Sequence, residues 1–431
     1  MIEQANRVFV QSFGCSTNMA DGEFISGCLS VEGYELVNRI EDADVLVFNT
    51  CAVKTPTENR MIDILRRVPK AKKVVVTGCL PLINFDRIKR ETKFDGILGP
   101  APGLKIAEVM KRIAHNERVI LLNRDAKPGL DLPRCFKNPV IGVIPVAYGC
   151  LGACSYCCVV SARGRLRSYS VDKVVDRVKK DVASGAREMW LTSQDMACYG
   201  RDIGVTLADL LEEVCNLEKS FYIRVGMMTP NHTLDILNRL VETYPHEKIF
   251  KFLHLPVQSG DDNVLKRMQR FYTIEDFNQI VATFRKTIPN ITIATDVICG
   301  FPGETTEAFK KTMQLVEKLK PDIVNISKFF PRPNTPAQKL EPKIPPSETK
   351  ERSKEMARLV RQISLEKNQA WMNWKGQILV DEKGKKPDSW IGRNFAYKPI
   401  VVKSKESLLG RLVNAHVVKA FQTYLRAEII N

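Results

Sequence analysis

Four of the chain's 12 cysteines lie within nine residues, in the stretch YGCLGACSYCCVV at positions 148–160. Three of them, Cys150, Cys154 and Cys157, have the spacing CxxxCxxC. A structural zinc site usually closes around four ligands, whereas an iron-sulfur cluster held by three thiolates keeps one iron open for another molecule. Because the fourth ligand is missing here, the spacing favours a cluster with an open iron.

The segments around this loop predict a partial barrel. Between about residues 140 and 330, six apolar stretches alternate with helical ones. The six predicted strands are VIGVIPVAYG, EMWLTS, FYIRVG, IFKFLHL, ITIATDVI and DIVNISKFF. Repeated βα units are typical of a (β/α)6 TIM-like barrel, whose sites lie at the carboxyl ends of the strands. The cysteine loop follows the first strand, so we expect it at that mouth.

The first hundred residues predict a separate parallel α/β domain. The apolar strands RVFVQSF, DVLVFNT and KKVVVTG alternate with helices near residues 22–31 and 59–67. One cysteine follows each strand, and these are Cys15, Cys51 and Cys79. The carboxyl ends of parallel strands meet at one edge of a sheet, so three thiols can converge there. Simple burial is the alternative, since cysteine is often a core residue.

The C-terminal segment, residues 371–431, has the short alternating runs of a small antiparallel β-barrel. It carries 11 Lys and Arg against 5 Asp and Glu. Basic and aromatic residues on such a barrel suit RNA backbone contacts and base stacking. Its interleaved aromatic residues are Trp374, Trp390, Phe395, Tyr397 and Tyr424. We expect some of them to be core residues.

The whole chain is also basic, with 65 Lys and Arg against 49 Asp and Glu and a formal net charge of +16. This balance favours a polyanionic partner such as nucleic acid, although solubility alone would also explain a basic surface. The fold class is therefore predicted to be α/β with a small terminal β-barrel. The expected parts are an N-terminal domain at 1–125, a barrel domain at 136–345, a bridging helix at 346–370 and an RNA-binding domain at 371–431.

Neither a leader nor a membrane span is recognisable, because MIEQANRVFVQSFGC has no basic-then-apolar pattern and the apolar runs are short. We therefore expect a cytoplasmic protein with no membrane partner. Thiols stay reduced in that compartment, so the cysteines indicate metal ligation or burial and not a disulfide framework.

The stretch CLGACSYC, with Tyr156 before its last cysteine, resembles the signature of the radical S-adenosylmethionine (SAM) superfamily. Further segments make nearly the whole chain similar to the methylthiotransferase family within it, and the C-terminal 60 residues resemble that family's TRAM module. These segments are GCSTNMAD, NTCAVK, TGCLP, ARGRLRS, LTSQDMACYG, LHLPVQSGDDNVLKRMQRFYT, TDVICGFPGETTE and FFPRPNTPA.

The resemblance implies two [4Fe-4S] clusters. Cys150, Cys154 and Cys157 would hold one, whose open iron binds SAM and splits it to a 5′-deoxyadenosyl radical. The N-terminal cysteines would hold an auxiliary cluster that carries the sulfur and accepts a methyl group from another SAM molecule. The radical would abstract hydrogen from an unreactive aromatic C–H. An electron donor and a sulfur source are further expected partners, which the sequence does not identify.

No catalytic acid or base is expected beyond the cluster ligands, because general acid or base catalysis is the wrong tool for such a C–H bond. Polar residues at the barrel mouth are the predicted SAM contacts, with structural hydrogen bonding as the alternative for each. They are Tyr156, Ser193, Gln194, Asp195, Arg224 and Asp296. His254 and Gln258 are plausible lining residues, and Cys158 is expected to be a small buried residue rather than a ligand.

Members of the methylthiotransferase family act on tRNA carrying isopentenyladenosine, on tRNA carrying threonylcarbamoyladenosine, or on a ribosomal protein. The stretches QSFGCSTNMADGE, FNTCAVKTPTENRM and VICGFPGET resemble the archaeal and eukaryotic type, which acts on threonylcarbamoyladenosine beside the anticodon. We therefore expect a tRNA methylthiotransferase of that type. A zinc-bearing RNA-binding protein without catalysis is the alternative from a different class.

Overall fold

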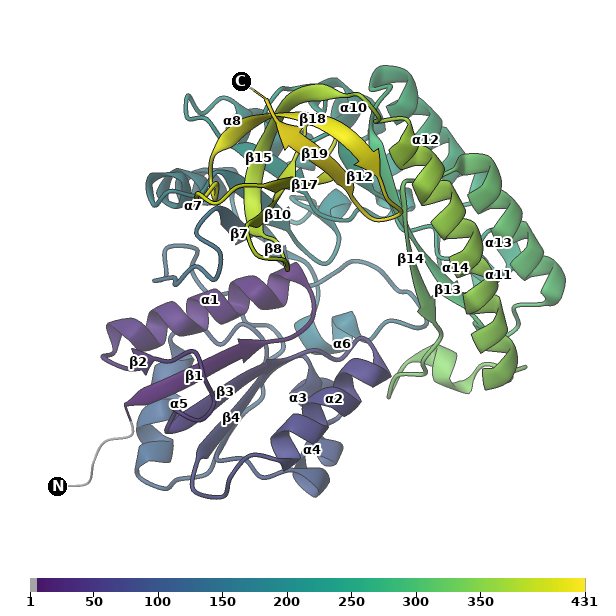
Figure 1. The fold of residues 1–431 in the computed structure, drawn as a ribbon. Coiled ribbons are helices and arrows are strands. Elements are labelled where there is room, and N and C mark those ends of the chain that lie inside the picture. The colour runs from purple at the N-terminus through teal and green to yellow at the C-terminus, as the bar shows by residue number, and fades with distance from the viewer. Residues whose placement is uncertain (1–5, 431) are drawn as a thin grey trace.

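The structure is a computed structural model that describes residues 6–430. Its N-terminal part is one six-stranded sheet in the order β2-β1-β3-β4-β5-β6, with every neighbouring pair parallel (Figure 1). The strands are β1 Arg7–Ser12, β2 Glu35–Leu36, β3 Val45–Thr50, β4 Lys73–Gly78, β5 Gly96–Leu98 and β6 Val119–Leu121. The helices are α1 Ser16–Val31, α2 Thr55–Arg66, α3 Leu80–Ile83, α4 Phe85–Glu91 and α5 Lys105–Ala114. The predicted parallel α/β architecture is confirmed.

Strand β3 shows why the sheet forms in this way. All six of its residues are buried, because separate hydrophobic clusters cover the two faces of the sheet. A strand covered on both sides reads as a continuous apolar run instead of an alternating one. Helix α1, by contrast, begins at Ser16, six residues before the predicted start. Its first turns carry Asn18 and Asp21, which are buried and polar and therefore mask the helical apolar pattern.

The central part contains the six predicted strands in chain order. These are β7 Ile141–Pro145, β10 Glu188–Thr192, β11 Tyr222–Val225, β12 Phe252–His254, β13 Thr292–Cys299 and β14 Ile323–Lys328. They form two parallel three-stranded sheets, which a single parallel bridge between Ile223 and Ile249 joins. The short pair β8 Ala147–Tyr148 and β9 Arg167–Ser168 is antiparallel and flanks the cysteine loop. The result is the expected partial (β/α)6 barrel, called the half-barrel below.

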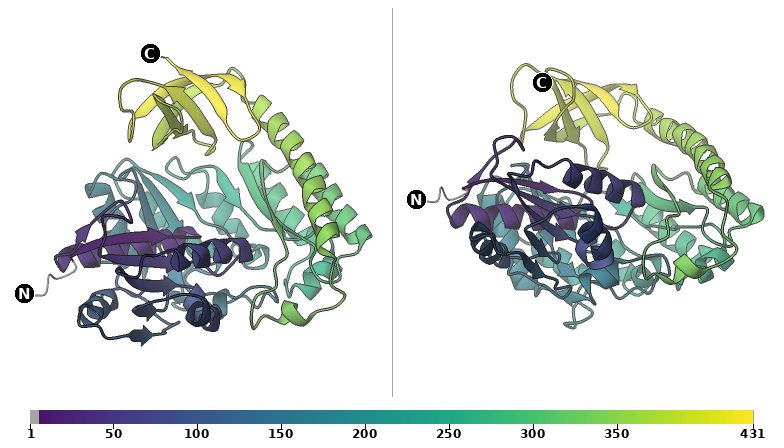
Figure 2. Two further views of the ribbon diagram at one scale, coloured as in Figure 1. Left: turned by 60° about the horizontal axis from the view of Figure 1, so that its bottom comes forward. Right: turned by 90° about the horizontal axis from the view of Figure 1, so that it is seen from below.

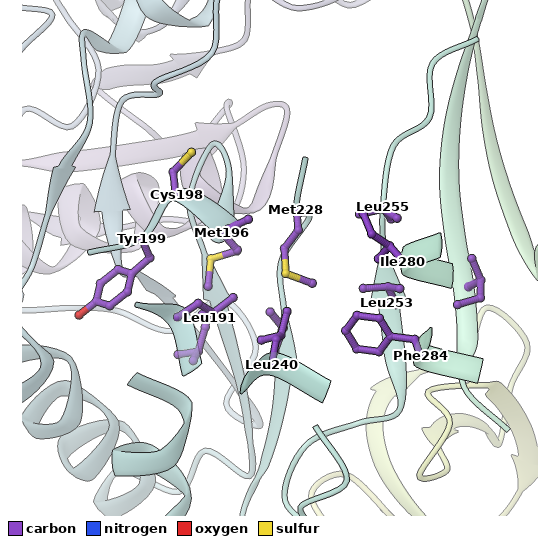
Figure 3. Packing of buried hydrophobic residues seen from close by; sticks show 14 of the residues in the cluster. Leu191, Met196, Cys198, Tyr199, Met228, Leu240, Leu253, Leu255, Ile280 and Phe284 are labelled. Carbon is purple, nitrogen blue, oxygen red and sulfur yellow. The ribbon is translucent and has the colours of Figure 1, made fainter. Parts of the chain in front are cut away.

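Helices enclose this half-barrel on its outer side. They are α7 Val171–Ala183, α8 Leu207–Cys215, α9 Pro230–Leu234, α10 Leu237–Thr243, α11 Asp262–Arg267, α12 Ile274–Thr287 and α13 Thr306–Leu319, with short 3-10 turns η1 Met196–Cys198 and η2 Pro336–Lys339. Helix α6, Val159–Arg163, packs instead against α3 of the N-terminal part. Side chains such as Leu191, Leu253 and Phe284 fill the space between strands and helices (Figure 3). The core is continuous, so the strand ends that present the site are held rigidly.

Helix α14, Pro346–Gln369, runs along the side of the central part and leads into the C-terminal barrel (Figure 2). The barrel is closed in the order β15-β16-β17-β19-β18. Its strands are β15 Lys375–Lys383, β16 Ser389–Arg393, β17 Pro399–Lys403, β18 Leu412–Ala420 and β19 Leu425–Ile429. All pairings are antiparallel except β17 with β19. A ring of five strands needs one parallel pair, because directions cannot alternate around an odd number.

The C-terminal barrel docks on the amino ends of the central strands. Lys251 N–H donates to the Phe395 carbonyl at 2.7 Å, and the Thr292 hydroxyl donates to the Ala396 carbonyl at 2.7 Å. The Tyr397 hydroxyl donates to Glu188 at 2.8 Å. The carboxyl ends of the strands thus face away from this contact. Within residues 6–430, no helix is both long and apolar enough to cross a lipid bilayer.

Candidate functional site

The three cysteines of the CxxxCxxC loop lie between β8 and α6, and each sulfur accepts one hydrogen bond. Gly152 N–H donates to Cys150 Sγ at 3.2 Å, and Val159 N–H donates to Cys157 Sγ at 3.4 Å. Hydrogen bonds to sulfur stabilise negative charge on it, as cluster-ligating thiolates require.

The third sulfur, Cys154 Sγ, accepts from Arg270 Nη1 at 3.4 Å. Without a bound cation the loop is nevertheless a poor place for thiolates. Burial and then the Asp195 carboxylate raise the pKa of Cys150 to about 11, and burial raises the pKa of Cys157 well above its ordinary value. A group that neutralises the three sulfurs therefore fits the loop, since metal binding deprotonates thiols outright.

The N-terminal cysteines meet at the carboxyl edge of the first sheet, as their positions after β1, β3 and β4 predict. Gly14 has a φ of +103°, and a Cβ there would lie 2.8 Å from Cys51 Sγ. The backbone beside Cys15 therefore presses against Cys51 at a place where only glycine fits. Burial raises the pKa of Cys79 to about 12, with Arg163 opposing the rise and Cys15 and Cys51 adding to it.

Helix α6 links the surroundings of the two sets of thiols. Its N-cap residue, Cys158, is buried, and its thiol donates to the Ala52 carbonyl at 3.5 Å. Ala52 follows Cys51, and Cys158 follows Cys157. This single contact therefore joins the neighbours of one cysteine from each set. Figure 1 shows α6 where the N-terminal sheet meets the central part.

Among the predicted SAM contacts, four residues lie around the cysteine loop. Gln194 accepts from Gly149 N–H at 2.7 Å, and the buried Ser193 hydroxyl finds no partner within residues 6–430. Tyr156 packs edge to face on Phe301, with ring centroids 6.3 Å apart. Asp195 is fully buried.

The carboxylate of Asp195 already accepts four hydrogen bonds from neighbouring residues. It accepts from Ala197 N–H at 3.1 Å, from Thr229 N–H at 3.0 Å and from the thiol of Cys198 at 3.1 Å, and also from the Thr229 hydroxyl. His232 lies close enough to Asp195 and Cys198 for the three to resemble a metal site. The hydrogen bonds to the carboxylate account for this cluster without an ion.

The other two predicted SAM contacts lie elsewhere in the barrel. Asp296 accepts from Asn325 at 2.7 Å and contacts His254 Nε2 at 3.1 Å. Burial raises the pKa of Asp296, but these two hydrogen bonds, together with the charges of His254 and Lys54, outweigh burial and lower the pKa overall. Arg224 faces the C-terminal barrel, 4.8 Å from the Trp190 ring and 5.5 Å from the Tyr397 ring. The structure thus does not bring Arg224 together with the cysteine loop.

Three family descriptions match the chain. Residues 7–99 match "Uncharacterized protein family UPF0004", residues 144–316 match the radical SAM superfamily and residues 377–430 match the TRAM domain. A probable threonylcarbamoyladenosine tRNA methylthiotransferase of Pyrococcus horikoshii is 41% identical over 98% of this chain and 99% of its own. The threonylcarbamoyladenosine tRNA methylthiotransferase of Homo sapiens is 34% identical over 99% of this chain and 74% of its own.

The chain belongs to the threonylcarbamoyladenosine tRNA methylthiotransferase family. Membership confirms the predicted radical SAM methylthiotransferase type, and it does not support the zinc-bearing alternative. The radical SAM superfamily uses a [4Fe-4S] cluster and SAM, and the hydrogen-bonded sulfurs of the CxxxCxxC loop fit such a cluster.

Solved structures show the same fold. A radical SAM methyltransferase, TsrM, from Kitasatospora setae matches with a TM-score of 0.55 and 16% identity over 77% of this methylthiotransferase chain and 76% of its own. The radical SAM enzyme OxsB matches with a TM-score of 0.52 and 10% identity over 90% of this chain and 63% of its own. At such identities the likeness concerns the arrangement of the chain and nothing further.

Two arginines of the methylthiotransferase site were missed by sequence reasoning. Arg163 Nε donates to Cys79 Sγ at 3.3 Å, and Arg270 donates to Cys154 Sγ. Both residues lie inside segments that resemble the family, ARGRLRS and LKRMQRFYT, but so do several other arginines. Which guanidinium meets a sulfur depends on packing between distant segments, and no local pattern encodes it.

Proposed function

We propose that this chain is a tRNA methylthiotransferase that inserts sulfur and a methyl group at C2 of threonylcarbamoyladenosine next to the anticodon, giving 2-methylthio-threonylcarbamoyladenosine. One observation carries the proposal. Three thiols follow strands of one parallel sheet, three follow the first strand of a neighbouring half-barrel, and Cys158 next to the second set contacts Ala52 next to the first, in a chain 41% identical to a relative with that name.

The proposed ligands are the two sets of cysteines. Cys150, Cys154 and Cys157 hold the [4Fe-4S] cluster of the half-barrel, and Cys15, Cys51 and Cys79 hold a second, auxiliary [4Fe-4S] cluster. The first cluster and SAM, when bound, supply the one-electron chemistry that an inert aromatic C–H requires. The Arg270 guanidinium and two backbone N–H groups hold negative charge on the first set of sulfurs.

The proposed SAM contacts are the polar residues of the mouth. Gln194 lies where the two parts meet, because its amide accepts from Gly149 beside the cysteine loop and donates to Thr17 of α1 at 3.2 Å. The others are Tyr156, Ser193, Asp195 and Asp296, whereas Arg224 faces the C-terminal barrel and is no longer a candidate. The buried, unpartnered hydroxyl of Ser193 supports a ligand at that position, since buried polar groups are normally paired.

The proposed partner is tRNA, and the proposed RNA-binding part is the C-terminal barrel. Phe421 and Tyr424 stack there with ring centroids 4.5 Å apart, and Lys419 lies 5.4 Å from the Phe421 ring. We also propose the division into 1–125, 136–345, 346–370 and 371–431, a cytoplasmic location, and partners that deliver electrons and sulfur.

An anaerobic assay tests the substrate. Reconstituted full-length protein is incubated with SAM, a reductant, a sulfide source and two tRNAs, one carrying threonylcarbamoyladenosine and one carrying isopentenyladenosine. We expect the 2-methylthio product only on the first tRNA. Product on the second tRNA instead would assign the chain to the other substrate. A colourless, zinc-loaded protein that stays folded would contradict any radical SAM activity.

A further inference from the structure

Arg163, at the end of α6 in the central part, contacts a sulfur of the N-terminal set of cysteines. It follows the CxxxCxxC loop in sequence and lies over the Tyr148 ring of the central part, 5.5 Å from its centroid, yet its side-chain hydrogen bonds all go to the N-terminal part. Its Nε donates to Cys79 Sγ at 3.3 Å, and its Nη2 donates to Asn18 Oδ1 at 2.5 Å and to Asp21 Oδ2 at 2.6 Å. With 2% of its surface exposed, the guanidinium is shielded from water.

The third nitrogen of the Arg163 guanidinium, Nη1, takes no part in these hydrogen bonds. Arg163 Nη1 is buried and has no hydrogen-bond partner within residues 6–430. A buried charged donor without a partner is costly, so such a group normally meets an acceptor. Asn18 and Asp21 occupy the Nη2 side, and the Cys79 sulfur occupies the Nε side. The unused donor therefore indicates an acceptor that belongs to whatever the thiols hold.

Arg270 shows what a complete set of contacts looks like at the other site. Its Nη1 donates to Cys154 Sγ at 3.4 Å, its Nη2 to the Pro256 carbonyl at 3.0 Å and its Nε to the Tyr272 hydroxyl at 3.3 Å. Each set of three cysteines thus has one buried arginine on one sulfur. Only the arginine at the N-terminal set keeps a free donor.

We propose that Arg163 is a positioning residue for the auxiliary cluster, donating hydrogen bonds to Cys79 Sγ and, through Nη1, to a sulfide of that cluster. The inference rests on the proposed function, because it takes Cys15, Cys51 and Cys79 as cluster ligands. A hydrogen bond and a positive charge at the sulfurs stabilise the more negative, reduced cluster, so Arg163 raises its reduction potential.

The test is a redox titration of the full-length, doubly reconstituted protein, followed by electron paramagnetic resonance. Cys150→Ala and Cys15→Ala proteins, each lacking one cluster, assign the two signals. In Arg163→Lys we expect the auxiliary signal to shift to a lower potential while the other signal stays in place. In the matched variant, Arg270→Lys, the signal of the CxxxCxxC cluster moves instead.

A second variant separates this role from a purely structural one. Asp21→Asn breaks the ion pair between the two parts but leaves the donors of Arg163 intact. We expect Asp21→Asn to keep the auxiliary potential at or above that of the unmodified protein. Equal falls in Asp21→Asn and Arg163→Lys, or no fall in either, would overturn the inference and leave Arg163 as an interface residue.

Iron analysis completes the design. If Arg163→Lys loses the auxiliary iron while Asp21→Asn keeps it, the result supports the inference, because the contact with the sulfurs and not the ion pair holds the cluster. If the unmodified protein binds only about four irons after reconstitution, the auxiliary cluster itself is absent. That outcome overturns the proposed function, and it is distinct from a failure of the Arg163 inference alone.

Discussion

Cys15 and Cys150 occupy equivalent kinds of position, since each lies just past a strand of a parallel sheet, but their surroundings differ. Cys15 is exposed at the N-cap of α1, whereas Cys150 is half-buried and its sulfur accepts a backbone hydrogen bond. Under the proposed function the two sets have separate tasks, SAM cleavage at the Cys150 set and sulfur transfer at the Cys15 set.

Cys15→Ala is therefore expected to leave reductive cleavage of SAM within about twofold of the unmodified rate and to abolish formation of the methylthio product. Chromatography of 5′-deoxyadenosine and of tRNA nucleosides measures both. Cys135→Ala, which removes a half-buried thiol outside both sets, serves as the control and should retain both activities. Loss of cleavage in Cys15→Ala, with the CxxxCxxC cluster intact, would contradict the assignment of separate tasks.

Glu188 is expected to make the free energy of unfolding depend on pH. Burial and the nearby Asp381 carboxylate raise the pKa of Glu188 to about 7, although Trp190 and Tyr397 donate to it. The folded state then binds the proton more tightly than the unfolded state. The stabilisation is complete below the ordinary carboxyl pKa and is lost as the pH rises through about 7.

Unfolding in urea between pH 5 and 8 tests this. The stability of the unmodified protein should fall relative to Glu188→Gln by up to about 1.4 kcal/mol per pH unit across that window. Glu218→Gln, at an exposed position, should follow the unmodified protein. Parallel curves for Glu188→Gln and the unmodified protein would show that Glu188 titrates normally.

At the scale of elements, a buried ion-pair network fixes how the N-terminal part meets the half-barrel. Arg134, in the linker, contacts Glu23 of α1 and lies 2.7 Å from Asp181 of α7. The side chains of Arg134 and Asp181 are each only 1% exposed. Removing one member of such a network leaves uncompensated buried charge.

Arg134→Ala should accordingly lower the free energy of unfolding by on the order of 3 kcal/mol. Thermal unfolding followed by circular dichroism measures this. Arg124→Ala removes an arginine from an exposed pair with Asp125 in the same linker and should change stability by less than about 1 kcal/mol. Equal effects of the two variants would mean that the network does not hold the parts together.

The six central strands and the three N-terminal strands that a cysteine follows, β1, β3 and β4, could be predicted from sequence, because apolar runs and strand ends are local patterns. The short strands β2, β5 and β6 were not predicted, since runs of two or three residues carry too little pattern. The start of α1 could not be predicted either. Asn18 donates to the carbonyls of Phe13 and Thr50, and Asp21 accepts from Tyr148 of the half-barrel. Polar residues that are buried against distant segments do not follow the rule that polar positions face solvent.

At the scale of the whole molecule, the C-terminal barrel lies against the central part (Figure 2), at the amino ends of the central strands. Each set of cysteines follows the carboxyl ends of strands in its own sheet. If an RNA binds as proposed, it contacts the C-terminal barrel at the amino ends of the central strands and places its target base near the cysteines at the carboxyl ends. Electrostatic contacts to phosphates would supply much of that binding.

The affinity for tRNA should consequently fall steeply with salt. Lys419→Gln, which removes a charge beside the Phe421–Tyr424 stack, should reduce the slope of log K against log salt by about 1. Lys318→Gln, an equal change of charge on the exposed outer helix α13, should leave the slope unchanged. Identical slopes for all three proteins would exclude Lys419 from the RNA-binding surface.

The central claim is the identity of the modified nucleoside, and mass spectrometry of nucleosides from bulk tRNA tests it most directly. Cells of the source organism are compared with and without this gene, and the gene is restored in a third strain. We expect loss of 2-methylthio-threonylcarbamoyladenosine and accumulation of threonylcarbamoyladenosine, both reversed on restoration. An unchanged level of the methylthio nucleoside in cells without the gene would contradict the proposed function.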